Sequence, residues 1–127
     1  MLNINIKTIP HDQQRYDTVG DYWMDHVSGE LQIRVSDMSN WRYEALVAFH
    51  ELAEYLQITH QEISIESIDA FDIQYEESRR PGDFSEPGDN PQAPYFKAHT
   101  VATDLEATLA MRLGVDWGDY DKAVCSL

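Results

Sequence analysis

Alternation of apolar and polar residues near the start of the chain predicts β-strands. Leu2, Ile4 and Ile6 alternate with polar residues, and Pro10 ends the run. Two further strand-like runs, DYWMD and ELQIRVS, flank the segment HVSG, whose Gly29 can adopt the backbone conformation of a hairpin turn. We therefore expect a small antiparallel β-sheet of about three strands.

The middle of the chain predicts a long amphipathic helix. The segment WRYEALVAFHELAEYLQ follows several possible N-cap residues, among them Asn40. Its apolar residues recur at helical spacing and form one wide stripe, which we expect to face the core. The stripe consists of Trp41, Ala45, Ala48, Phe49, Leu52, Ala53 and Leu56.

Three more helical segments are predicted downstream. One covers residues 66–79, a second and stronger one covers Tyr95–Leu113 and stops at Gly114, and a short last helix is capped by Asp116. The apolar stripe of the second is formed by Ala98, Val101, Ala102, Leu105, Leu109 and Leu113.

Between these helices, residues 80–94 contain four of the five prolines and predict an irregular loop, which is a candidate lid. The elements together predict a single α+β domain over residues 1–127. In this domain the small sheet packs on two long helices and several shorter ones.

Composition supports a folded protein without covalent cross-links. Hydrophobic residues make up 43% of the 127 positions, which is enough for one core. The lone Cys125 cannot form an internal disulfide, and no apolar run is long enough to span a bilayer. The first residues lack the pattern of a secretory signal. We therefore expect a cytoplasmic protein.

The chain is strongly acidic, with 9 Lys and Arg against 23 Asp and Glu and a formal net charge of −14. Such a surface repels nucleic-acid phosphates and anionic membranes, so neither is an expected partner. Solubility and a few carboxylates at a cation site explain most of this charge. An acidic interaction protein that mimics DNA is the alternative.

The clearest chemical motif lies on the long helix. His50 and Glu54 are four residues apart, so on a helix they can bind one ion together. Glu51 follows His50 as in H-E-x-x-H helices, in which two histidines bind zinc and the glutamate activates water. Glu54 takes the place of the second histidine, and a carboxylate is also a zinc ligand. On the helical wheel His50 and Glu54 lie on the flank of the apolar stripe.

The later strong helix carries a matching pair. His99 and Glu106 are seven residues apart and nearly superposed on the helical wheel, beside the apolar stripe. The small residues Thr103 and Ala110 share that flank, which would let another helix approach closely. The alternative for both helices is that these polar residues only face solvent.

If the two helices pack along these flanks, His50, Glu54 and His99 complete a set of two histidines and one carboxylate. Three protein ligands with an open fourth position are typical of catalytic zinc. Glu106 would then be a fourth ligand or the acceptor that orients His99. We expect a divalent-metal site, preferably for Zn²⁺, with Glu51 as general base in the hydrolysis of an unknown substrate.

A second acidic pattern predicts a different chemistry. Glu51 and Glu54 are followed by Glu66 and Asp69, and carboxylates three residues apart share a helix face and suit Mg²⁺. This spacing resembles the ExxE…ExxD signature of the all-α nucleoside triphosphate pyrophosphohydrolases of the MazG kind. The N-terminal strands and the few basic residues available to hold a triphosphate speak against this alternative.

The segments RYDTVGDYW, ELQIRVS, YEALVAFHELAEYL and LGVDWGDYD together resemble an uncharacterised bacterial and phage protein family. The order of strand, hairpin and H-E helix also resembles the core of minimal zincin-like metallopeptidases, in an HExxE variant. That resemblance implies zinc, with His50 and Glu54 as ligands and Glu51 as the base. Because Glu54 replaces a histidine, a metal-binding relative that cleaves nothing stays open.

Overall fold

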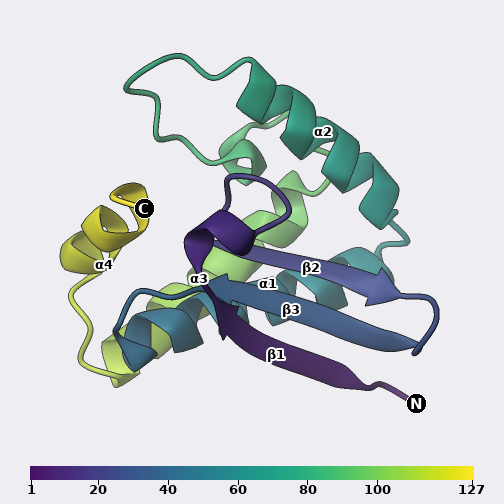
Figure 1. The fold of residues 1–127 in the computed structure, drawn as a ribbon, viewed down its shortest axis with the longest axis horizontal. Coiled ribbons are helices and arrows are strands. Elements are labelled where there is room, and N and C mark those ends of the chain that lie inside the picture. The colour runs from purple at the N-terminus through teal and green to yellow at the C-terminus, as the bar shows by residue number, and fades with distance from the viewer.

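The computed structural model describes residues 1–127 and has an α+β fold with three strands and four α-helices (Figure 1). This is the fold class that the sequence predicts. The strands are β1 (Ile4–Ile9), β2 (Gly20–Asp25) and β3 (Glu30–Ser36), and the helices are α1 (Trp41–His60), α2 (Ile65–Glu77), α3 (Phe96–Arg112) and α4 (Trp117–Cys125). Two short 3-10 helices, η1 (His11–Gln13) and η2 (Pro87–Asp89), lie in the connections.

The sheet is mixed, with the strand order β1-β3-β2. Strands β2 and β3 pair in the antiparallel manner that the sequence predicts, but β1 pairs with β3 in parallel, so the prediction of an antiparallel sheet is wrong for β1. The connection after β1 carries the chain past β3 to the far edge of the sheet, where β2 begins. Alternation identifies a strand but not its neighbour or its direction, because the side-chain period is the same in both kinds of sheet.

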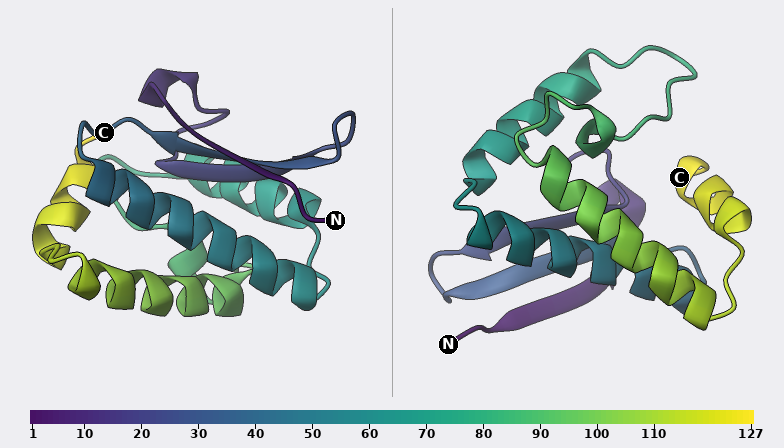
Figure 2. Two further views of the ribbon diagram at one scale, coloured as in Figure 1. Left: turned by 90° about the horizontal axis from the view of Figure 1, so that it is seen from below. Right: turned by 180° about the vertical axis from the view of Figure 1, so that it is seen from behind.

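The elements form three layers (Figure 2). Helix α1 packs against β2 and β3, and α3 packs against the side of α1 that faces away from the sheet. Leu31 and Ile33 of the central strand and Leu46 of α1 are completely buried between the first two layers. Helix α1 is therefore covered from two sides.

The buried face of α1 coincides with the predicted stripe only in part: Ala53 is buried, and Ala48 and Leu52 pack against the core. Trp41 and Leu56, which we placed on the core face, are 61% and 46% exposed, whereas the polar His50 and Glu54 are buried. The sheet and α3 cover α1 from two sides. The buried surface of α1 therefore includes its polar flank, which the hydrophobic pattern places outside the core. The buried residues of α1 are Leu46, Val47, His50, Ala53, Glu54 and Ile58.

Helix α3 shows the same shift. Val101 and Leu105 of the predicted stripe are exposed, while His99 and Glu106 are buried. The remaining buried residues of α3 are alanines, and small side chains allow two helix backbones to approach closely. The two flanks that carry the polar pairs therefore meet.

The helix ends and the hairpin turn follow their local signals. Asn40 caps α1 by accepting hydrogen bonds from two backbone N–H groups, and Asp116 caps α4 by accepting one, from the N–H of Asp119. Gly29 and Gly114 have positive φ angles of 71° and 68°, as the predicted turn and helix stop require. Helix α2 covers most of the predicted range 66–79. None of the helices combines the length and apolar character needed to cross a membrane.

Gly20 is required where β2 passes over α1. A Cβ atom at this position would lie 2.6 Å from Cγ1 of Val47 and 2.8 Å from Oε1 of Glu51. These distances are too short for real carbon and oxygen neighbours, so only glycine allows this approach. The contact sets the distance between β2 and the face of α1 that carries the polar pair.

The substitution Gly20→Ala is expected to lower the free energy of unfolding by about 1–3 kcal/mol, the usual cost of overpacking. Urea denaturation of G20A, V47A and the double variant measures the effect. The alanine should cost less in the V47A background, because the Cγ1 atom that it meets is gone. An equal cost in both backgrounds would exclude the contact with Val47 as the cause.

Candidate metal centre

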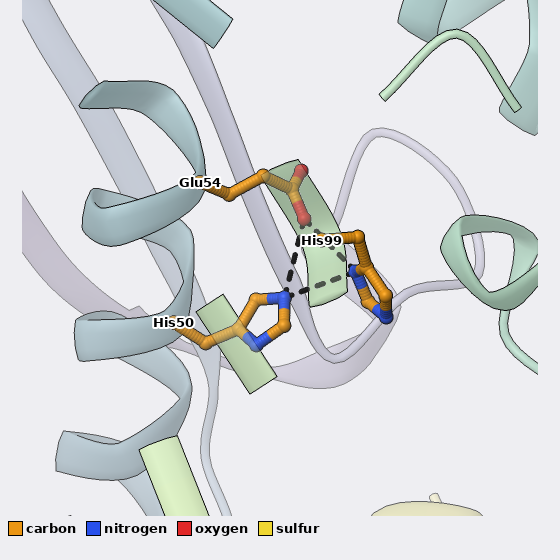
Figure 3. Close-up of side chains that lie close together, drawn as sticks. All are labelled: His50, Glu54 and His99. Atoms are coloured by element: carbon orange, nitrogen blue, oxygen red, sulfur yellow. Dashed lines mark hydrogen bonds and ion pairs between the residues drawn. The ribbon is translucent and has the colours of Figure 1, made fainter. Parts of the chain in front are cut away.

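Three side chains from two helices converge at one point between α1 and α3 (Figure 3). Nε2 of His50 lies 3.2 Å from Oε2 of Glu54 and 3.2 Å from Nδ1 of His99. Nδ1 of His99 lies 2.9 Å from the same Glu54 oxygen. All three side chains are buried. The structure thus brings together the three residues that the sequence analysis grouped.

The other nitrogen of His50 is held by a carboxylate on α3. Nδ1 of His50 lies 2.7 Å from Oε1 of Glu106, and the Tyr120 hydroxyl donates to Oε2 of Glu106 at 2.5 Å. A carboxylate accepts hydrogen bonds, so Nδ1 of His50 carries the proton in this pair. When His50 is neutral, its lone pair is therefore on Nε2, which points at the centre.

Glu54 is oriented in a comparable way by the sheet. The hydroxyl of Tyr22, on β2, donates to Oε1 of Glu54 at 2.8 Å. This bond occupies one carboxylate oxygen and leaves Oε2 to face the two histidines. The strand that Gly20 brings close to α1 therefore supplies the partner of Glu54.

The loop between α2 and α3 covers His99. A Cβ atom at Gly88 would lie 2.5 Å from Nδ1 of His99, so the loop backbone rests directly on the imidazole ring. On the outer side of the ring, Nε2 lies 3.0 Å from a carboxylate oxygen of Glu86 and 3.2 Å from one of Asp89. The sequence predicts a candidate lid here, and residues 86–89 of it do lie over the site.

The converging atoms carry lone pairs and negative charge, and these shift the pKa values of the three side chains. Burial alone would lower the pKa of His99, but the contacts with Glu54 and Glu86 raise it to about 10. Burial would raise the pKa of Glu54, but the hydrogen bonds with the two histidines lower it to about 2. The pKa of His50 is likewise held well above its usual value by Glu106 and Glu54, against the effect of burial. The centre therefore favours a bound positive charge, which is supplied by protons or by a metal ion.

Glu51 lies beside this centre rather than in it. Its carboxylate packs near Gly20 and lines the same pocket as His50, Glu54 and His99, which has a volume of about 580 Å³. Burial, and after it the charge of Glu54, holds the pKa of Glu51 well above its ordinary value. Such a carboxyl group can gain and lose a proton nearer to neutral pH than an exposed one.

Glu106 does not have the place that the sequence analysis gave it. We expected a fourth ligand or the acceptor that orients His99, but both oxygens of Glu106 are engaged by His50 and Tyr120. Seven-residue spacing places Glu106 two turns from His99, and the crossing of the helices brings it opposite His50 instead. Glu106 therefore supports the centre through its contact with His50.

Sequence reasoning missed four polar residues that back the converging side chains. They come from a strand, a loop and the last helix, and no spacing along the chain relates them to the H-E helix. The sequence pointed only to the two acidic residues of the candidate lid, because they lie in the loop of residues 80–94 that it already identified. The four residues are Tyr22, Glu86, Asp89 and Tyr120.

The carboxylates of the competing acidic pattern do not gather. Glu54 is engaged by histidines, Asp69 faces Arg15 at 3.4 Å, and Glu66 is exposed. Neither group of side chains close enough to hold an ion contains Glu51, Glu66 or Asp69. The three strands also disagree with an all-α fold.

Asp72 of α2 forms the pocket wall next to the centre. It accepts hydrogen bonds from the hydroxyls of Tyr95, at 2.5 Å, and Tyr16, at 3.1 Å. Burial raises the pKa of Asp72 to about 6, although the two hydrogen bonds act in the opposite direction. This interaction ties α2 to the start of α3 and to the segment before β2.

No protein-family model matches the chain, and no curated protein and no solved structure matches it either. The resemblance to zincin-like metallopeptidases therefore stays a prediction from the sequence.

The variant Asp72→Asn should change how stability depends on pH. The folded-state pKa of about 6 lies above the value of about 3.9 for an unfolded aspartate, so folding favours the protonated acid. The side chain stabilises the fold most below about pH 4, and this contribution of roughly 3 kcal/mol is lost as the pH rises through about 6.

An asparagine stays neutral, so the wild-type free energy of unfolding minus that of D72N should fall by about 2–3 kcal/mol between about pH 4 and pH 7. Urea titrations of both proteins at a series of pH values measure this difference. A difference that is constant, or that rises with pH, would contradict the raised pKa of Asp72.

Proposed function

We propose that His50, Glu54 and His99 bind a divalent metal ion, preferably Zn²⁺. The single observation that carries this proposal is the convergence of Nε2, Oε2 and Nδ1 at separations of 2.9–3.2 Å. The ligand atoms of a tetrahedral zinc site lie about 3.3 Å apart, because each bond is about 2.0–2.1 Å long. Two imidazoles and one carboxylate are a donor set that zinc accepts.

The partners behind the three ligands support the same proposal. Histidines that bind metal usually donate their other N–H to a carboxylate, which fixes the tautomer and the ring orientation. Glu106 has this relation to His50. Tyr22 leaves one oxygen of Glu54 free to bind, and the carboxylate of Glu86 lies next to the outer nitrogen of His99.

We further propose that the bound ion activates water for hydrolysis. Three protein ligands leave one position of a tetrahedral ion open, and the ligands line a pocket large enough for a substrate group. A metal ion lowers the pKa of bound water to about 7. Glu51, adjacent to the ligands and with a raised pKa, is suited to accept the proton of that water.

The other two functions have less support from the geometry. A pyrophosphohydrolase needs carboxylates that hold Mg²⁺ and several cations that hold phosphates. Two arginines line the pocket, and one of them, Arg79, is already paired with Glu76 and Asp83. An acidic DNA mimic needs no buried cluster of two histidines and a glutamate. The net charge of −14 is compatible with the DNA mimic but disfavours the binding of a triphosphate.

Metal analysis tests the proposed ligands. The wild-type protein, stripped with chelator, reloaded with Zn²⁺ and dialysed, should retain a tightly bound ion. His50→Ala and Glu54→Gln should each weaken this binding at least about 100-fold, since loss of a supporting group alone costs 10–100-fold. The control His60→Ala removes an exposed histidine from the end of the same helix and should retain the ion.

Elemental analysis and calorimetric titration provide the measurement, and circular dichroism establishes that each variant is folded. Glu54→Gln is the milder variant, because an amide has the same shape and can still accept from Tyr22. Equal zinc affinity in the wild type and in folded E54Q and H50A would overturn the proposed centre.

The variant Glu51→Gln separates catalysis from binding. It should retain the zinc affinity of the wild type, because Glu51 is not a ligand, but lose at least about 100-fold in turnover if it is the general base. A mixed peptide library analysed by mass spectrometry, with zinc-loaded protein, supplies candidate substrates. Cleavage that persists in E51Q would exclude Glu51 as the base. Zinc binding without cleavage of any peptide would exclude a peptidase, and the protein would then be a metal-binding protein or a hydrolase of another bond.

A further inference from the structure

We propose that Glu86, Asp89 and the outer nitrogen of His99 form a second divalent-cation site. This inference rests on the proposed metal centre, because both ions would share the imidazole of His99. Nε2 of His99 lies 3.0 Å from Oε2 of Glu86 and 3.2 Å from Oδ1 of Asp89. One ligand atom from each residue lies within 4.8 Å of the others. We call this group the outer site and the proposed centre the inner site.

The unsatisfied nitrogen of His99 is the observation that distinguishes the outer site from an ordinary acidic patch. The His99 side chain is only 6% exposed, and its Nε2 atom is buried without a hydrogen-bond partner. Both carboxylates are near enough, but neither accepts a hydrogen bond from this nitrogen. A buried polar atom without a partner is rare in proteins, and an ion bound by all three residues would satisfy it.

The loop backbone explains why the two carboxylates lie side by side. The N–H of Asp89 donates to the carbonyl of Glu86 at 3.1 Å and closes a tight turn. Gly88, inside this turn, rests on the ring of His99, where any side chain would collide with it. The turn therefore presents both carboxylates at the edge of the imidazole that lies opposite the inner site.

Because the two ions would share one imidazole, the outer ion must displace a proton from it. A neutral imidazole has one lone pair, which the inner ion takes at Nδ1, and Nε2 then carries a proton. When the outer ion binds, the bond from Nε2 to the metal forms as the N–H bond breaks, and the proton leaves to water. The result is an imidazolate that bridges two divalent ions, with no change in oxidation state.

The outer site should be the weaker of the two. The side chains of Glu86 and Asp89 are 52% and 64% exposed, so water competes for them and completes the coordination of the ion. Two carboxylates and one imidazole accept Zn²⁺ or Mn²⁺. All three ligands of the inner site are buried, so water competes less for an ion bound there.

Counting zinc ions tests the outer site. Calorimetric titration of the metal-free full-length chain with Zn²⁺, with elemental analysis of the saturated protein, should give two ions of different affinity for the wild type. The double variant Glu86→Gln with Asp89→Asn should lose the weaker ion and retain the tighter one. The control Asp121→Asn removes another exposed carboxylate that lines the same pocket, and it should keep both ions.

His50→Ala gives the reverse result, because it should lose the tighter ion and keep the weaker one. One ion in the wild type, with unchanged affinity in E86Q/D89N, would overturn the outer site and leave the inner site intact. One ion whose affinity falls in E86Q/D89N would also overturn it, since the carboxylates would then only orient His99. No ion in any variant would overturn the proposed function itself.

Discussion

The convergence of two imidazole nitrogens and one carboxylate oxygen between α1 and α3 is the interaction on which the surrounding structure depends. Electron pairs that face one another in a buried space repel unless a positive charge lies between them. In the absence of metal, protons supply that charge, which is why the pKa of His99 is raised to about 10 and that of Glu54 is lowered to about 2. A divalent ion meets the same requirement at a single point.

The layers of the fold are arranged so that this centre stays buried and supported. Alanines on α3 permit a close approach to α1, and Gly20 permits the same for β2. Each of the three converging side chains is then contacted by a polar group from a different element: Glu106 on α3, Tyr22 on β2 and Glu86 in the loop. Helix α4 contributes through Tyr120, which holds Glu106 in place. Helices α1, α3 and α4, strand β2 and the loop before α3 thus all contribute side chains to one cluster.

A buried cluster of this kind is weak evidence for stability and better evidence for function. Burying charges costs more free energy than burying apolar side chains of the same size, even when the charges are well paired. The flanks of α1 and α3 hold polar residues where leucine or alanine would pack without that cost, while Leu56 and Leu105 remain exposed. Perturbed titratable groups in a pocket are typical of sites that bind or react.

The sequence by itself determined the elements and the candidate residues. Period, caps and turn glycines predicted the hairpin and the helices, and the four-residue spacing of His50 and Glu54 placed both on one helix face, because these signals are local. The tertiary structure alone decided that β1 runs parallel to β3, that the polar flanks of α1 and α3 are buried, and that Glu106 meets His50 rather than His99. It also brought in Tyr22, Tyr120 and Glu86 from distant segments. Such contacts depend on how layers cross and which faces they cover, and no periodicity along the chain encodes that.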